Sequence, residues 1–481
     1  MSAPYVVSFG PWVPDGVNSV YEYDGQYSAT EVPLSDISNV IYYNGAYRNI
    51  KSGAAVAAGS SLGSACLGAY AAIDSGGAQA LYAGDATNLY SWDGSAWTSV
   101  GSGYSASKWR FAQFNNCINA TNGVDQIQGQ SIGGGAFGNL ATGAPTGNVL
   151  GVVNQFLIVG DITATAQTQS VYSDPTATAY PNRIHWSALG NDANWPTPLT
   201  TDAYAFQAGY QDMEGLYGPV MFIGGLEQYG VVMQKTGISR MSYVGGDQVF
   251  SFEPFERKRG LVTQDAACQV GRYIFFLADD GFYFTDGSSV QSIGQGVIDD
   301  WFWENVNASQ IDSITAGYDS NSRSVYFSIP TGVNTSPDTL LSYNPEEKKW
   351  CKSSIPAGIV FTDFDGTRHT LGLFDSSGGY QRLTGAALSG YMETYDLAFT
   401  DSMRRLITGI KPNTGGSPTC RAGSRVSLQD SVSYTADVPT DSFTGVSPII
   451  SGGTYNRIRV TASNLAPAYG AVIYANTEGE V

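Results

Sequence analysis

Short runs of alternating apolar and polar residues, separated by turns containing Gly, Asn or Asp, extend along most of the 481-residue chain. The run LYSWDGSAWTSV at 89–100 alternates on both sides of Asp93-Gly94. A period of two places every second side chain on one face of a strand, and Asp-Gly between two such runs indicates a β-hairpin. We therefore predict an all-β chain in which tight turns connect short strands.

The same turn unit recurs in VYEYDGQYS, IYYNGAYRN, FYFTDGSSVQSI and LLSYNPEEKKW. From residue 81 onward the predicted strands gather in clusters of three or four over about 40 to 50 residues, the size of one propeller blade. Neither a WD nor a kelch signature recurs in the sequence. The pattern therefore predicts an irregular β-propeller, with a series of β-sandwiches or a large jelly roll as the alternative.

Three segments depart from this pattern. In GVIDDWFWENVNASQ (296–310) the residues Ile298, Trp301, Phe302 and Val306 are spaced for one face of a helix, which we expect to be the only substantial one. Residues 52–80 are rich in Ala, Gly and Ser and are expected to form closely packed strands. From about residue 396 the alternating runs lack the turn unit, so we predict a separate C-terminal β-structure there.

The composition favours strands and a soluble chain. There are 58 Gly and 30 Tyr, and only 14% of the residues are charged, which disfavours helices. The net charge of −18 comes from 24 basic and 42 acidic residues. Because phosphate contacts require Lys and Arg, this chain is a poor candidate for gripping nucleic acid. Its acidity suits solubility, or a wall past which a polyanion slides without sticking.

The sequence also carries expectations about compartment. The cysteines lie far apart and include no CxxC pair, so reduced thiols are expected at five positions: Cys66, Cys117, Cys268, Cys351 and Cys420. The N-terminal MSAPYVVSFGPW has no basic region followed by an apolar run, and no stretch reaches about 18 apolar residues. We therefore expect synthesis in a cytoplasm, with no signal peptide and no membrane-spanning segment.

Catalytic candidates are few, and each has a structural explanation. His185 and His369 are the only histidines, and no GxSxG elbow accompanies them. A propeller glycosidase would need two carboxylates, for which Asp279-Asp280 and Asp299-Asp300 are the candidates. The first pair belongs to a turn and the second begins the predicted helix. In SWDGSAW, Asp93 and Gly94 are adjacent, which breaks the spacing of a sialidase Asp-box.

Metal and anion motifs are also missing. No D-x-D-x-D-G loop with a distal Glu and no zinc-ligand spacing occurs in the sequence. The short basic cluster ERKRG (256–260) is expected to be a solvated turn, with an intersubunit contact as the alternative. We therefore predict no catalytic, cofactor-binding or metal-binding residues, no cofactor and no enzymatic activity.

Several stretches, taken in their order along the chain, resemble one family. These are KWRFAQFNNCINATNGVDQIQ, YPNRIHWSALGNDANW, VMFIGGLEQYGVVMQKTGISRM, GRYIFFLADDGFYFTDGSSVQSIGQGVID and SVYFSIPTGVNTSPDTLLSYNPEEKKW. Together they resemble the tail nozzle or hub proteins of short-tailed bacteriophages, also called packaged-DNA stabilisation proteins. The resemblance covers roughly residues 80 to 390, with an echo in YNRIRVTASN. It rests on strand-and-turn patterns, and residues 52–80 and 161–180 depart from it.

The resemblance implies a β-propeller attached to a β platform that forms a tube. It further implies a homo-oligomeric ring, a hexamer, in the virion tail below the portal and adaptor, made in the bacterial host cytoplasm. Such a ring extends the DNA channel, retains packaged double-stranded DNA and conducts it on ejection without sequence-specific binding. We accordingly expect a platform from residues 1–55 and 396–481 and a propeller from 56–395. The alternatives are a glycan-binding or glycan-cleaving propeller and a receptor-binding tail protein.

Overall fold

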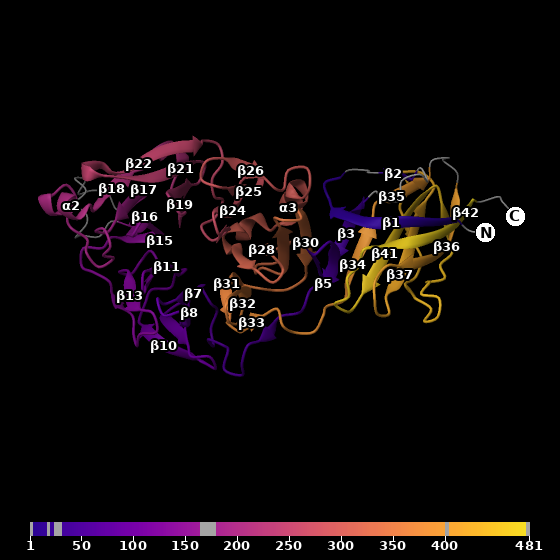
Figure 1. Ribbon diagram of the computed structural model, residues 1–481, viewed down its shortest axis with the longest axis horizontal. Helices are drawn as coiled ribbons and strands as arrows, with labels where there is room; N and C mark the ends of the chain where they lie inside the picture. Colours follow the sequence, from indigo (N-terminus) through magenta and orange to yellow (C-terminus); the bar gives the residue numbers. More distant parts are fainter. Residues whose placement is uncertain (1–2, 17–19, 24–30, 164–178, 400–403, 478–481) are drawn as a thin grey trace.

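A ring of radially arranged sheets and a separate curled sheet make up the computed structural model, which describes residues 3–16, 20–23, 31–163, 179–399 and 404–477. Within these residues seven four-stranded antiparallel sheets form the blades of a β-propeller. A twelve-stranded mixed sheet, built from the N- and C-terminal strands, lies beside it (Figure 1). The predicted all-β fold, a propeller with an additional terminal β-structure, is confirmed.

Each blade is a meander whose first strand lies at the centre of the ring. The first four blades contain β7 (Gly68–Ile73), β8 (Gln79–Gly84), β9 (Asn88–Trp92) and β10 (Trp97–Ser102); β11 (Arg110–Phe114), β12 (Cys117–Thr121), β13 (Gln128–Ser131) and β14 (Gly138–Asn139); β15 (Thr146–Val153), β16 (Phe156–Thr163), β17 (Ala179–Trp186) and β18 (Gly209–Asp212); β19 (Val220–Gly225), β20 (Gly230–Gln234), β21 (Ile238–Gly245) and β22 (Val249–Glu256). The last three contain β23 (Ala267–Val270), β24 (Tyr273–Ala278), β25 (Gly281–Thr285) and β26 (Val290–Ser292); β27 (Thr315–Asp319), β28 (Ser324–Ile329), β29 (Thr339–Asn344) and β30 (Lys349–Ser353); β31 (Ile359–Asp365), β32 (Arg368–Phe374), β33 (Tyr380–Arg382) and β6 (Ala54–Ala55).

The ring closes by pairing segments from its two ends. β6, which precedes the first blade in the chain, forms the outer strand of the last blade, with Gln381 opposite Ala55 and Arg382 opposite Ala54. In the same blade the buried carboxylate of Asp363 accepts hydrogen bonds from the Tyr380 hydroxyl and from Nε of Arg382. The closure therefore joins residues more than 300 positions apart in the sequence.

At Asn44-Gly45 the recurring turn unit is a two-residue tight hairpin between Val40–Tyr43 and Ala46–Asn49, as predicted, and it lies outside the blades. In three other places the unit forms the corner between the third and fourth strands of a blade. Asp93, Asp286 and Asn344 lie at this corner in three blades, and in each case a side-chain oxygen accepts the backbone N–H groups two and three residues later. The loops at these corners span four residues, whereas a tight hairpin has a two-residue loop. The Asp or Asn oxygen accepts the backbone N–H groups of the longer loop, which have no partner on a neighbouring strand. Gly94 has a φ of 99°. The unit at Asp24-Gly25 lies outside the described residues.

The stretch of small residues brings blades into close contact. A Cβ atom on Gly68 of β7 would lie 2.0 Å from the carbonyl oxygen of Trp109, and one on Gly84 of β8 would lie 2.2 Å from the Trp109 ring. Only glycine permits this approach of backbone and indole. Within 52–80 the expectation of closely packed strands is confirmed for β7, whereas residues 56–67 form no strand.

Two α-helices and three 3-10 helices interrupt the strands in the described residues. They are α2 (Thr201–Phe206), η1 (Gly215–Tyr217), η2 (Gly246–Gln248), α3 (Asp299–Asn305) and η3 (Ala308–Ser313). The predicted helix at 296–310 is present as α3 and η3, but it is broken at Val306, which has extended backbone angles. None of the helices in the described part of the chain is long and apolar enough to cross a membrane.

The terminal sheet curls around an apolar core that is continuous with that of the neighbouring blades. Its strands are β1 (Ala3–Trp12), β2 (Val20–Tyr23), β3 (Glu31–Ser38), β34 (Gly390–Thr394), β35 (Asp396–Phe399), β36 (Arg405–Pro412), β37 (Thr419–Arg425), β38 (Ser433–Tyr434), β39 (Val438–Pro439), β40 (Ser451–Gly453), β41 (Tyr455–Ala462) and β42 (Gly470–Thr477). The curl brings β37 toward β40, where the hydroxyls of Ser424 and Ser451 lie 3.0 Å apart. β34 lies within the range 56–395 predicted for the propeller and pairs in this sheet with β3 and β41.

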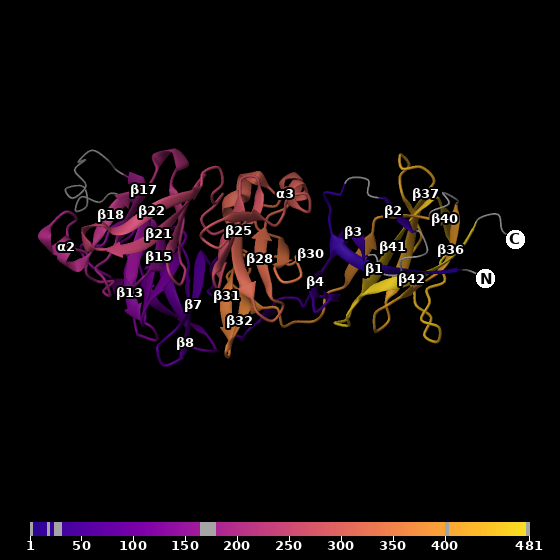
Figure 2. The same cartoon turned by 45° about the horizontal axis from the view of Figure 1, so that its top comes forward.

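The terminal sheet is attached to the side of the propeller, away from the ring axis (Figures 1 and 2). Lys352 of β30 forms an ion pair with Asp36 of β3, with the charged atoms 2.7 Å apart. Asp15, just after β1, accepts the first free N–H groups of α3. The rings of Trp12 and Trp301 meet edge to face at 5.2 Å. A short hairpin of β4 (Val40–Tyr43) and β5 (Ala46–Asn49) connects the two parts.

Candidate functional site

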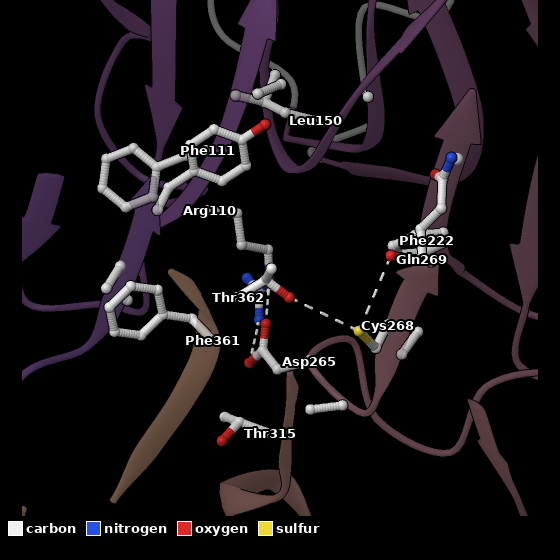
Figure 3. Close-up of a pocket in the computed structure, with 18 of the residues that line it drawn as sticks. Arg110, Phe111, Leu150, Phe222, Asp265, Cys268, Gln269, Thr315, Phe361 and Thr362 are labelled. Atoms are coloured by element: carbon white, nitrogen blue, oxygen red, sulfur yellow. Dashed lines mark hydrogen bonds and ion pairs between the residues drawn. The ribbon is translucent and has the colours of Figure 1, made fainter. Parts of the chain in front are cut away.

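A cavity of 680 Å³ occupies the centre of the propeller, lined by the first strands of all seven blades (Figure 3). Its wall combines apolar side chains such as Leu150 and Phe222 with the polar side chains of Arg110, Asp265 and Thr362. A cavity of this size with a few convergent polar groups is the default place to look for a ligand.

An ion-pair cluster connects opposite sides of the ring. Asp265, which precedes β23, accepts hydrogen bonds from Nζ of Lys108 at 2.7 Å and from Nε of Arg110 at 3.0 Å. Arg110 begins β11, so this contact joins the second and fifth blades across the cavity (Figure 3). Burial acts to raise the pKa of Asp265, but the charges of Arg110 and Lys108 outweigh it and lower the pKa. The carboxylate is therefore ionised and fully engaged.

The remaining polar side chains connect neighbouring blades. The amide of Gln113 bonds both backbone groups of Ile73, and Nε2 of Gln269 donates to the carbonyl oxygen of Gly225 at 2.7 Å. The Thr362 hydroxyl accepts the N–H of Tyr318 at 3.0 Å. Each of these bonds crosses from one blade to the next, so the polar groups of the wall hold the ring together.

The thiols in the described chain are unpaired, as expected. Cys268 faces the cavity and lies 3.9 Å from the Thr362 hydroxyl (Figure 3). Burial raises the pKa of Cys268 to about 12, so it is a protonated thiol and not an activated nucleophile. Cys66 is likewise raised to about 12 by burial.

The two histidines have different surroundings. His185 of β17 is buried against the ring of Trp195, and burial, with the nearby charge of Arg183, lowers its pKa to about 3. It is therefore neutral at physiological pH. His369 of β32 lies at the rim of the cavity and is exposed. The structure does not bring the two together.

Neither predicted pair of acids lines the cavity. Asp280 is exposed and forms an ion pair with Arg259 of the 256–260 turn at 2.8 Å. Asp299 is buried, and its Oδ1 accepts the N–H of Phe282. Burial, reinforced by the nearby charge of Asp15, raises the pKa of Asp299 to about 7 against the effect of that hydrogen bond. Among the described residues no group of three or more His, Cys, Asp or Glu could hold a metal ion.

A second surface stands out on the terminal sheet. The segment 426–450 between β37 and β40 exposes large apolar side chains, and we call it the terminal arm. Phe443 is 96% exposed and Ile450 is 77% exposed. Asp441 accepts the N–H groups of Phe443 and Thr444, so the turn that carries Phe443 is internally bonded. The arm is rooted in the sheet by paired backbone bonds between Ile410 and Ser447.

Comparison with known proteins shows no family for this chain. Neither a family model nor a curated protein matches the chain. Similar solved structures include the extracellular domain of BT4673 from B. thetaiotaomicron, at 12% identity over 71% of this chain with a TM-score of 0.44. This chain spans 41% of that one.

Two further structures match most of this chain. BBS1N in complex with ARL6DN matches at 12% identity over 70% of this chain and 99% of that one, with a TM-score of 0.41. A chain of the Mitotic Checkpoint Complex matches at 9% identity over 76% and 99%, with a TM-score of 0.37. Similarity at this level carries no argument about function.

Proposed function

We propose that this chain is a non-enzymatic structural protein of a short bacteriophage tail. In this proposal copies assemble side by side into a closed ring, a hexamer, below the portal and adaptor. The ring extends the DNA channel, helps to retain packaged DNA and conducts it on ejection. The chain is made in the host cytoplasm and resides in the virion tail. The resemblance of residues 80–390 to nozzle proteins supports this proposal.

The observation that carries the proposal is the terminal arm. Side chains as apolar as Phe443 and Ile450 cost free energy when water covers them, and a partner that covers them would remove this cost. The bonded turn at Asp441 holds Phe443 in place before any partner arrives, which lowers the entropy cost of association. A neighbouring copy in a ring would cover these side chains without any rearrangement of the turn.

The propeller supports an assembled channel in a different way. Its own central cavity is crossed by the Asp265 ion pairs, which block the propeller axis to a duplex. In the proposed ring the conduit would therefore form between copies. Residues 51–385 carry 29 acidic and 16 basic residues, and a surface of this sign repels phosphate groups and keeps DNA mobile.

The glycan-cleaving alternative is less well supported. It requires two carboxylates facing one pocket about 5 to 10 Å apart. Asp265 is the one carboxylate among the described cavity-lining residues, and it is occupied by two cations. A receptor-binding role would use the same terminal arm toward a different partner, and the experiment below separates it from ring assembly.

The test compares two variants, each of which replaces one exposed apolar side chain with a charged one. Phe443→Asp places a carboxylate in the expected contact, whereas Leu216→Asp does so at an 88% exposed position on the propeller. Sedimentation velocity at micromolar concentration should show that Phe443→Asp disrupts the ring and Leu216→Asp does not. As separated monomers, both variants should have the same melting temperature as the wild type. Equal oligomeric states for wild type, Phe443→Asp and Leu216→Asp would refute the assigned contact.

A further inference from the structure

The outer face of the terminal sheet carries a row of arginines. Along β41 the side chains alternate, so Ile458 and Val460 enter the apolar core while Arg457 and Arg459 lie on the opposite, half-buried face. This alternation follows from the two-residue period of a strand. The arginines are therefore built into the sheet surface.

The register with β37 places two of these cations directly opposite each other. Arg421 of β37 pairs with Arg459 of β41 across the antiparallel ladder, and Arg457 lies opposite Gly423. Like charges at directly opposed positions destabilise a sheet unless other groups compensate them. Arg425, at the end of β37, lies on the same face.

The carboxylates available for compensation are already occupied. Asp396 accepts hydrogen bonds from Arg457, with Nε at 2.6 Å, and from Arg425. Glu393 accepts Nε of Arg459 at 2.5 Å and the hydroxyl of Tyr434 at 2.6 Å. Both carboxyl groups are buried. Four guanidinium groups thus share these two carboxylates, and Asp36 is a third carboxylate, 3.7 Å from Nη2 of Arg459.

Of these four arginines, Arg421 is the one without a hydrogen bond to any residue in the described part of the chain. Its nearest carboxylate oxygen, on Glu393, is 3.7 Å from Nη2, beyond hydrogen-bond distance. Its Nε is buried and has no partner among the described residues. The ring of Tyr434 lies 4.5 Å from the guanidinium carbon. The side chain is 24% exposed, so solvent and small ions reach part of the guanidinium group. The buried Nε is the donor whose lack of a partner is costly.

We propose that Arg421, together with Arg457 and Arg459, binds an oxyanion of the phosphate class on the outer face of the terminal sheet. A tetrahedral dianion offers several acceptor oxygens to neighbouring guanidinium forks, which is the geometry that arginine recognises best. It would also fill the open donors of Arg421 and neutralise the opposed pair. The inference rests on the sheet register and stands independently of the proposed tail function.

The probe is inorganic phosphate, titrated by calorimetry into the wild-type protein at constant ionic strength set with chloride. We expect saturable binding to one site per chain. Arg421→Gln should weaken it by at least about tenfold, because charge-assisted hydrogen bonds are lost. Arg421→Lys keeps the charge but loses the planar fork and should bind with intermediate affinity. Arg257→Gln, the same charge change in the exposed 256–260 turn, should bind like the wild type.

The outcomes separate the ligand sources. A short DNA duplex that competes with phosphate at this site identifies a phosphodiester as a natural source, and failure to compete identifies free phosphate. Absence of saturable phosphate binding to the wild type would overturn the proposal, as would equal affinities for Arg421→Gln and Arg257→Gln. Thermal melting of each variant shows that the protein is folded, so loss of binding is not confused with unfolding.

Discussion

The ion pairs across the propeller cavity should contribute measurably to its stability, and Asp265→Asn tests this. The substitution keeps the size of the side chain and one acceptor oxygen but removes the charge that faces Lys108 and Arg110. In the wild type, Nζ of Lys108 and both Nε and Nη2 of Arg110 donate to this carboxylate, at 2.7, 3.0 and 3.1 Å. The variant leaves two cations close together with no counter-charge.

The magnitude follows from the burial of the three groups. Breaking a fully buried pair costs about 3 to 5 kcal/mol, whereas an exposed pair contributes about 0 to 1 kcal/mol. The side chain of Asp265 is 20% exposed, and those of Lys108 and Arg110 are similarly shielded. We therefore expect a loss of about 2 kcal/mol, which for a propeller of this size lowers the melting temperature by about 3 °C.

The assay is thermal unfolding followed by circular dichroism, with Asp247→Asn on the exposed loop after β21 as the matched control. That control should change stability by less than about 0.5 kcal/mol. The pKa of Asp265 is lowered in the folded state, so its stabilisation is present above the ordinary aspartate pKa. It is lost as the pH falls through the folded-state pKa. The difference between wild type and Asp265→Asn should therefore shrink in acid. Equal melting of Asp265→Asn and Asp247→Asn at neutral pH would refute the role of the cross-cavity pair.

Three further substitutions test other parts of the structure. The stability of the wild type should decline as the pH rises from about 4 to 7, and Asp299→Asn should remove this decline. The raised pKa of Asp299 makes the folded state hold a proton that the unfolded chain releases in this range. A wild type whose stability does not change with pH in this range would contradict this. Gly68→Ala should lower the free energy of unfolding by about 1 to 3 kcal/mol through the clash with Trp109, and the melting temperature should fall with it. An unchanged melting temperature would contradict the close packing. Asp15→Ala should cost about 1 kcal/mol and speed amide exchange at the start of α3, measured by hydrogen exchange; unchanged exchange would contradict the cap.

The spacing of apolar residues is sufficient to predict the strands, the blade-sized clusters and the helix beginning near Asp299. The periods of a strand and a helix depend only on residues close together in the sequence. The break at Val306 could not be read from that periodicity, since its apolar spacing continues the helical pattern. The short helix α2 spans only six residues, too few to show a helical period. The four-residue blade corners were predicted as tight turns because Asp-Gly also favours a two-residue hairpin.

The contacts between distant segments could not be predicted from the chain alone. Asp265 meets Arg110 only because seven blades close into a ring, and β6 completes the last blade across more than 300 residues. The opposition of Arg421 and Arg459 depends on the register of β37 with β41. Phe443 looks like any core residue in the sequence, and only the fold leaves it in water.

Native mass spectrometry of the purified full-length chain at micromolar concentration tests the central claim most directly. A ring-forming nozzle predicts one dominant closed oligomer, a hexamer of the 51.1 kDa chain, which negative-stain microscopy should show as a ring with an open centre. A protein that remains monomeric under these conditions would contradict the account.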